Sequence, residues 1–191
     1  MSSQSSQLVL PVSSSRDHVR GPTNPGLTLL EYGDYECPHC GAAHLVVEAV
    51  RWRMGARLRF VFRHFPLSQA HPHAQKAAEA AEAAGAQRKF WTMHDRLFAH
   101  QDALDTDSLL AHAMLIGLDV ARFANALAEG VHWQRVREDF ISGVQSGVNG
   151  TPTFFINGLR YDGPRDVGSL IEALEREEAG EAGKSADVAV P

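Results

Sequence analysis

The sequence predicts an α/β protein whose elements run βαβ, then an all-helical stretch, then ββα. Two short apolar runs, residues 27–32 and 58–63, flank a stretch with the three- and four-residue spacing of a helix. Residues 74–144 are then rich in helix formers, interrupted by capping residues and glycines. Near the end, Asn157-Gly158 joins two β-type runs and favours a tight hairpin. These patterns place a helical insertion between two β-containing parts.

Length and composition exclude several classes of protein. The chain has 191 residues, enough to bury a sizeable core without disulfides or metals. Hydrophobic residues make up 44% and charged residues 21%, which argues against disorder and fibrous repeats. A formal net charge of −5 argues against binding nucleic acid through its phosphates. No apolar run approaches the ~20 residues of a membrane span, so we expect no membrane insertion.

The first half of the chain is predicted to form a βαβ unit. Residues 27–32 are an apolar run bounded by glycines, which is typical of a buried strand. From residue 38 the apolar positions recur with helical spacing as far as Gly55, which ends the helix. Residues 58–63 alternate and are rich in β-branched and aromatic side chains, so they predict a second strand.

The second half is predicted to be helical and then to return to strands. Residues 74–84 are almost entirely helix formers. Further helical patterns cover residues 90–98, 109–116, 120–128 and 133–144. The chain then forms the strands 153–156 and 159–161, and an amphipathic helix over 167–178 closes the fold.

Both ends of the chain are predicted to be flexible. Residues 1–15 are mostly polar, and Pro11 breaks their short apolar patch. No basic residue precedes Arg16, so the pattern of a secretory signal is missing and we expect a cytoplasmic protein. Residues 179–191 are rich in Gly, Ala and Glu and are expected to form a flexible tail.

The two cysteines of the chain form one motif, Cys37-Pro38-His39-Cys40. Pro38 suits the first position of a helix, which places Cys37 at a helix N-terminus, where free N–H groups and the helix dipole stabilise a thiolate. His39 adds a potential cation beside it. Cys40 falls on the apolar face of the helix. We therefore expect an exposed, activated Cys37 and an inward-facing Cys40 that resolves a mixed disulfide.

The cysteine motif belongs to a longer segment, residues 29–40, Leu-Leu-Glu-Tyr-Gly-Asp-Tyr-Glu-Cys-Pro-His-Cys, and a second segment follows far downstream, residues 150–158, Gly-Thr-Pro-Thr-Phe-Phe-Ile-Asn-Gly. Together the two segments resemble the thioredoxin superfamily, specifically its DsbA-like branch. The resemblance implies a thioredoxin-like domain formed by residues 16–66 and 148–178, with residues 67–147 as an inserted helical domain. Family members with this strand-to-CxxC sequence occur in the bacterial cytoplasm, and others are fused to transporter domains.

The resemblance also implies roles for single residues. Cys37 matches the attacking cysteine and Cys40 the resolving one. Pro152 matches the cis-proline that faces the active site, and Thr151 matches the residue that touches bound peptide. Glu31 matches a buried acid that accepts or relays the proton of the resolving thiol, although its position in the sequence also suits a surface carboxylate on a strand edge.

The expected function is that of a thiol–disulfide oxidoreductase that exchanges a Cys37–Cys40 disulfide or dithiol with protein or small-molecule thiols, without a cofactor. Expected partners are protein or peptide thiols and disulfides, and a recycling partner such as glutathione or a reductase. The alternative is a thioredoxin-like peptide-binding or redox-sensing module without turnover. A third hypothesis, glutathione conjugation by an enzyme of a related fold, is disfavoured, because enzymes of that kind typically use serine and lack the cysteine pair.

Other ionisable residues near these motifs have simpler interpretations. His71 and His73 could complete a zinc site with the cysteines, but one residue between two histidines is not the usual spacing, so we expect no metal. Both histidines are expected in a loop. His64 is expected on the surface, at the end of a strand.

Two acidic residues, Asp34 and Glu36, flank the cysteine motif. Like charge disfavours a thiolate, so both are expected to raise the pKa of Cys37. This puts a strongly lowered pKa of Cys37 in doubt.

Overall fold

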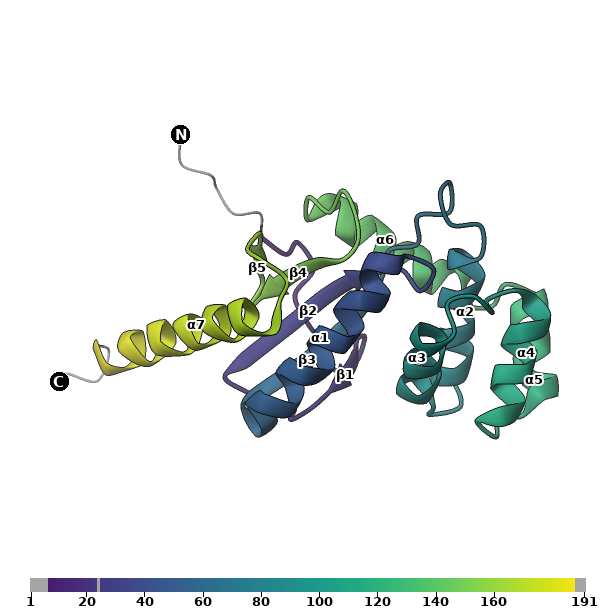
Figure 1. Cartoon of the computed structure of the whole chain (residues 1–191), viewed down its shortest axis with the longest axis horizontal. Helices are drawn as coiled ribbons and strands as arrows, with labels where there is room; N and C mark the ends of the chain where they lie inside the picture. Colours follow the sequence, from purple (N-terminus) through teal and green to yellow (C-terminus); the bar gives the residue numbers. More distant parts are fainter. Residues whose placement is uncertain (1–6, 24, 188–191) are drawn as a thin grey trace.

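The computed structural model describes residues 7–23 and 25–187, with side chains as far as residue 180. Within these ranges a five-stranded sheet has the order β1-β3-β2-β4-β5 (Figure 1). At its centre β2 (Leu27–Gly33) and β3 (Leu58–His64) pair in parallel, and the other neighbours pair antiparallel. The hairpin of β4 (Thr153–Ile156) and β5 (Leu159–Tyr161) lies beside β2. The strands predicted from the sequence are confirmed within one residue at each end.

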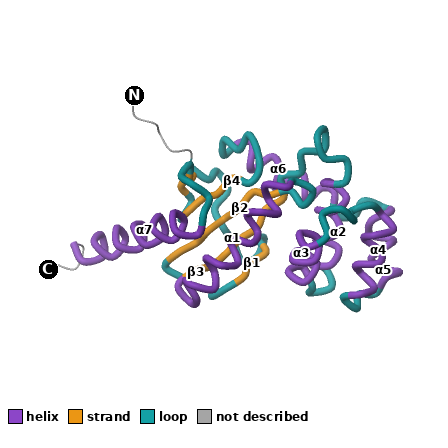
Figure 2. Tube along the Cα trace, viewed as in Figure 1, coloured by secondary structure: helices purple, strands orange, loops and turns teal. Residues whose placement is uncertain are grey.

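The helices follow the predicted order as well. α1 (Pro38–Met54) and the 3₁₀ turn Gly55–Arg57 connect β2 to β3, and α7 (Val167–Asp187) follows β5. Between β3 and β4 come the five helices of the insertion, which are α2 (Ala74–Gly85), α3 (Phe90–Ala99), α4 (Thr106–Leu115), α5 (Val120–Ala128) and α6 (Trp133–Gln145). α1 crosses the sheet, and α2 to α5 form a group beside it (Figure 2).

The central strand β2 is covered on both faces. Leu27 and Leu29 belong to the large apolar cluster that also contains the inward face of α1. Leu30 and Tyr32 point to the opposite face, where a second cluster packs against Phe140 of α6. Every residue of β2 is buried, as expected for a strand in the middle of a layered α/β fold. The parallel pair also brings the carboxyl ends of β2 and β3 to the same edge of the sheet, beside the start of α1.

The ends of the chain are more ordered than predicted. Leu8 is buried in the cluster with Leu30 and Val61, and its N–H donates to the carbonyl of Gly158 at 2.8 Å. Residues 8–12 are therefore held against the sheet and α6, and the prediction of a flexible arm is wrong for them. The C-terminal helix continues to Asp187, through Gly180 and Gly183. Residues 1–6 and 188–191 lie outside the described residues.

The strand β1 (His18–Arg20) is not indicated by any sequence pattern, because three residues are too few to show alternation. It is held by tertiary contacts. Trp91 donates its indole N–H to the Val19 carbonyl at 3.1 Å, and Arg20 pairs with Asp95 at 2.5 Å.

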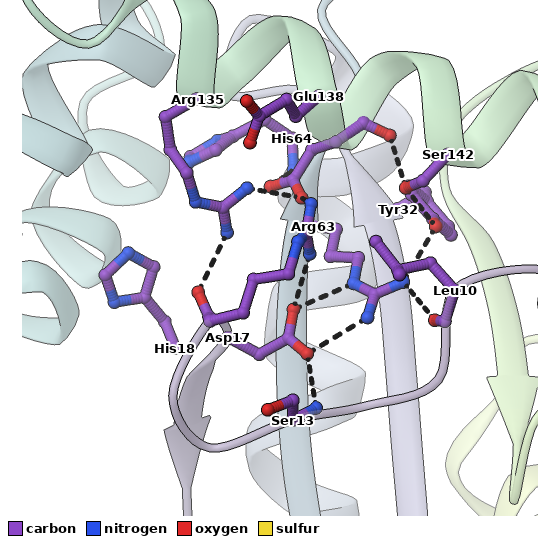
Figure 3. Close-up of polar contacts among 12 residues, drawn as sticks. Leu10, Ser13, Asp17, His18, Tyr32, Arg63, His64, Arg135, Glu138 and Ser142 are labelled. Atoms are coloured by element: carbon purple, nitrogen blue, oxygen red, sulfur yellow. Dashed lines mark hydrogen bonds and ion pairs between the residues drawn. The ribbon is translucent and has the colours of Figure 1, made fainter.

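A buried arginine ties the N-terminal segment to the sheet (Figure 3). Arg63 in β3 is fully buried and makes two hydrogen bonds to the Asp17 carboxylate, at 2.9 and 3.0 Å. It also donates to the Leu10 carbonyl and to the Tyr32 hydroxyl. Tyr32 in turn hydrogen-bonds Ser142 of α6 at 2.8 Å. One cation therefore connects the N-terminal segment, the centre of the sheet and α6.

Candidate active site

The cysteine motif lies at the junction of β2 and α1. Cys37 is the N-cap residue of the helix, with extended backbone angles, and Pro38 occupies the first turn. The Cys37 N–H donates to the Asp34 carbonyl at 3.2 Å, and the N–H groups of Cys40 and Gly41 donate to the Cys37 carbonyl at 3.0 and 3.1 Å. The sequence folds this way because proline at the first helical position costs no hydrogen bond. Cys37 is thereby fixed at the positive end of the helix dipole.

Both cysteines are free thiols and both are buried, so the expectation of an exposed Cys37 is wrong. Cys37 is 4% exposed and Cys40 0%. The cover over Cys37 comes from the loop before β4, whose Thr151 carbonyl lies 3.6 Å from the Cys37 sulfur. The Thr151–Pro152 peptide bond of this loop is cis. Residues 151 and 152, distant in sequence, are thus brought directly onto the cysteine motif.

The two thiols differ strongly in acidity. The pKa of Cys37 is lowered from 9.0 to about 5. The largest cause is a hydrogen bond from the Cys40 thiol, with burial acting in the opposite direction. The backbone N–H groups of His39 and Cys40 contribute further hydrogen bonds that favour the thiolate, and the Thr151 side chain lowers the pKa in the same direction. A thiolate at Cys37 is therefore the ordinary ionisation state of the reduced pair at neutral pH.

Cys40 has the opposite environment. Burial, the hydrogen bond to Cys37 and the charge of Glu31 raise its pKa far above the usual range. The Asp34 N–H lies 3.4 Å from its sulfur. Cys40 therefore stays protonated until a base removes its proton or Cys37 loses its negative charge.

Glu31 is a buried acid rather than a surface carboxylate. It is 2% exposed, because β2 lies in the middle of the sheet. Its Oε1 has no hydrogen-bond partner among the residues that the structure describes. Burial, and after it the negative charge of Cys37, raises the pKa of Glu31 to about 8, while Arg165 acts in the opposite direction. A carboxyl group with this pKa can hold or release a proton near neutral pH.

The acidic residues beside the motif do not prevent the low pKa of Cys37. The Asp34 carboxylate is fully buried and accepts hydrogen bonds from the N–H groups of Glu36 and Leu67, at 2.8 and 2.9 Å. Its Oδ2 also lies 2.8 Å from Nδ1 of His71. The Glu36 carboxylate accepts from the backbone N–H of His73 at 2.6 Å. Both carboxylates are thus held by donors of the loop between β3 and α2.

Pro38 and His39 are exposed on the first turn of α1. His39 contacts the Cys37 sulfur through its backbone N–H. His64 is not the surface residue that was expected, since it is 1% exposed and its Nε2 lies 2.9 Å from Glu82. It is buried because α2 and α6 cover the end of β3.

Sequence reasoning missed Gln101, which contacts the active-site turn, and it did not predict the contact of His71 with that turn. Gln101, just after α3, donates from its side-chain nitrogen to the carbonyls of Tyr35 and Cys37 at 2.7 and 2.9 Å. A side chain at Gly41 would collide with Gln101. No sequence signal marks Gln101, whereas His71 follows β3, whose carboxyl end lies next to that of β2, and that topology could have identified it.

Among the described residues, side chains that could hold a metal converge in two groups, neither of which contains a cysteine. They are His44, His94 and Asp95, and His64, Glu82 and Asp139. Arg20 already pairs with Asp95, and Arg16 and Arg135 pair with Asp139. The zinc alternative built on the cysteine pair with His71 and His73 is not among the converging groups. No described helix has the length and apolar character that crossing a membrane requires.

The chain is similar to proteins of known sequence and structure. A family model described as thioredoxin matches residues 13–176. The Na⁺/H⁺ antiporter NhaA 1 of Mycobacterium sp. (strain KMS) is 48% identical over 172 residues, which are 88% of this chain and 28% of the antiporter. The chain thus spans about a quarter of the length of this relative.

Two solved structures show the same fold. BdbD from Bacillus subtilis has a TM-score of 0.80 at 21% identity, covering 92% of this chain and 97% of BdbD. The thiol-disulfide exchange protein alpha-DsbA2 from Wolbachia pipientis has a TM-score of 0.72 at 22% identity, covering 83% of this chain and 85% of that protein. With the family model matching most of its length, the chain belongs to this thioredoxin family, and it has the fold of BdbD and alpha-DsbA2.

Proposed function

We propose that the chain is a thiol–disulfide oxidoreductase that works through the Cys37–Cys40 pair. The observation that carries this proposal is the contrast in acidity within one motif, with a pKa of about 5 for Cys37 and a pKa raised far above the usual range for Cys40. Only a thiolate attacks a disulfide, so such a pair gives each cysteine a fixed role. The similarity in fold to the thiol-disulfide exchange protein alpha-DsbA2 supports the same chemistry.

In the oxidising direction, a substrate thiolate attacks the sulfur of Cys37 in the Cys37–Cys40 disulfide. The electron pair of the S–S bond leaves on Cys40, which takes a proton. A second substrate thiolate then attacks the substrate sulfur of the mixed disulfide, and Cys37 leaves as a thiolate. The substrate loses two electrons and forms a disulfide, while the cysteine pair gains two electrons.

Glu31 supplies or accepts the proton of Cys40 in this scheme. Its charge raises the pKa of Cys40, and its own pKa is about 8, so proton transfer between the two groups is possible at neutral pH. Thr151 and Pro152 form the loop that faces Cys37, and we assign them to binding the substrate backbone by strand-like pairing. Glutathione or a reductase would recycle the pair, and no cofactor takes part.

The stabilised thiolate favours oxidation of substrate thiols. Lowering the pKa of the attacking cysteine stabilises the reduced form, and each unit is worth about 1.4 kcal/mol, or ~30 mV for a two-electron couple. Thioredoxin, with a pKa near 7, has a potential of about −270 mV. A pKa of about 5 is two units lower, so the pair should be more oxidising than thioredoxin by up to ~60 mV at neutral pH.

Turnover separates this proposal from the alternative, a redox-sensing module that reacts once. Catalytic amounts of the protein should accelerate both the reduction of insulin by dithiothreitol and the oxidation of a reduced model protein by oxidised glutathione. Cys37→Ser should abolish both activities, and Glu138→Gln, an exposed site on α6, should leave them unchanged. Stoichiometric reaction without turnover would identify a redox switch and refute the proposed enzymatic activity.

A further inference from the structure

The loop between β3 and α2, residues 65–73, is attached to the active-site turn through acidic side chains. Two of its groups bind the same oxygen of Asp34, the Leu67 N–H at 2.9 Å and His71 Nδ1 at 2.8 Å. A third, the N–H of His73, binds Glu36 at 2.6 Å. The Asp34 side chain is completely buried, and that of His71 is 20% exposed.

Asp34 is also joined to both cysteines through its backbone. Its carbonyl accepts from the N–H of Cys37 at 3.2 Å, and its own N–H lies 3.4 Å from the Cys40 sulfur. Its second carboxylate oxygen accepts from the Glu36 N–H at 2.8 Å and closes the turn. The position of Asp34 therefore fixes the placement of both sulfurs.

The charge of Asp34 requires a partner at this place. A buried carboxylate next to a cysteine disfavours the thiolate, as the sequence led us to expect. His71 is the ionisable side chain in contact with that carboxylate, so its imidazolium form offsets the negative charge. The groups that face His71 are Asp34, Cys37 and Glu36. Although burial lowers the pKa of His71, these three raise it, and the net shift is upward from 6.5.

The Cys37 thiol and the His71 imidazole lose their protons in a definite order. The Cys37 thiolate forms with a pKa of about 5, which lies below the raised pKa of His71. His71 therefore keeps its proton throughout the pH range in which Cys37 ionises. A thiolate, a carboxylate and an imidazolium then coexist around one turn.

We propose that His71 is a positioning residue for thiol–disulfide exchange, which holds Asp34 in the active-site turn and offsets its charge, and so stabilises the Cys37 thiolate without touching either sulfur. This role rests on the proposed function. It means that the loop of residues 65–73, outside the cysteine motif, influences the redox equilibrium of the cysteine pair.

The test compares two variants at His71 with a control two residues away. His71→Asn keeps a side-chain N–H for Asp34 but carries no charge, whereas His71→Ala removes both. The control is His73→Asn, since His73 is exposed and uses only its backbone N–H to bind Glu36. The readouts are the Cys37 pKa, from the ultraviolet absorbance of the thiolate, and the equilibrium constant with glutathione.

We expect His71→Asn to raise the Cys37 pKa by about half a unit or more, and to shift the glutathione equilibrium toward the disulfide by about threefold at pH 6. This difference should shrink as the pH rises through the raised pKa of wild-type His71, since a raised histidine pKa contributes only below that pKa. In the His71→Asn background, Asp34→Asn should restore the pKa, because the uncompensated carboxylate is removed. His73→Asn should match the wild type.

An unchanged Cys37 pKa in His71→Asn, or the same shift in His73→Asn, would overturn the proposal. A shift in the glutathione equilibrium that does not shrink as wild-type His71 loses its proton would also overturn it, because it would indicate a structural effect instead of a charge. If His71→Ala fails to fold, the comparison of His71→Asn with wild type decides the question. Neither readout needs turnover, so absence of insulin reduction by the wild type would refute the proposed function without affecting this result.

Discussion

Replacing Glu31 by glutamine should change how stability depends on pH. In the reduced fold the pKa of Glu31 is about 8, against an ordinary value of 4.5. A carboxyl with a raised pKa in the folded state binds more protons there than in the unfolded chain, so stability is lost as pH rises from about 4.5 to about 8. The glutamine side chain of the Glu31→Gln variant carries no charge at any pH. The advantage of the variant should therefore grow with pH through this window.

The size of the effect follows from the shift. Each pH unit inside the window is worth about 1.4 kcal/mol, so the variant should gain about 2–3 kcal/mol relative to wild type between pH 5 and pH 7. For a chain of this length that corresponds to roughly 5–10 °C in Tm. The assay is urea unfolding of the reduced proteins at both pH values, with Glu138→Gln as the control for an exposed carboxyl. A stability difference that does not change with pH would refute the raised pKa and, with it, the proton-relay role of Glu31.

Three further predictions concern the cysteines, the buried ion pair and the turn. Iodoacetamide at neutral pH should label Cys37 before Cys40 in the reduced protein, as located by peptide mass, and preferential labelling of Cys40 would reverse their roles. Arg63→Met should destabilise by up to about 3–5 kcal/mol in urea unfolding, because it leaves the buried Asp17 with only the partly exposed Arg16 as a cationic partner, and a loss below about 1 kcal/mol would contradict that account. Gln101→Ala should lower the free energy of unfolding by about 1–3 kcal/mol, since two carbonyls of the active-site turn lose their donor. An unchanged midpoint of urea unfolding would show that water replaces the Gln101 side chain as donor.

Most of the fold could be predicted from local patterns. The glycine-bounded run that became β2 and the Asn157-Gly158 turn are short-range signals, and they fixed strand positions to within a residue. β1 and the packing of Leu8 could not be predicted, because both depend on contacts with parts of the chain distant in sequence. The end of α7 was missed because Gly180 and Gly183 disfavour a helix, whereas the structure continues the helix through both.

The candidate site was predictable where a motif specifies it and not elsewhere. The motif placed Cys37 at a helix N-terminus, but its burial depends on the loop of Thr151, more than a hundred residues away. The sequence also placed two acids beside the motif without showing where their carboxylates point. The Asp34 carboxylate contacts His71 instead of the sulfur, because the loop after β3 places His71 beside it.

The ionisation of the cysteine pair tests the central claim most directly. The ultraviolet absorbance of the thiolate, followed from acid to alkaline pH in the reduced protein, should show one transition at a pKa of about 5. Cys37→Ser should abolish it. Cys40→Ala should move it upward, because the Cys40 thiol is the largest single contributor to the lowered pKa. A transition above about pH 8 in the wild type, or one that persists in Cys37→Ser, would contradict the assignment of Cys37 as the attacking thiolate.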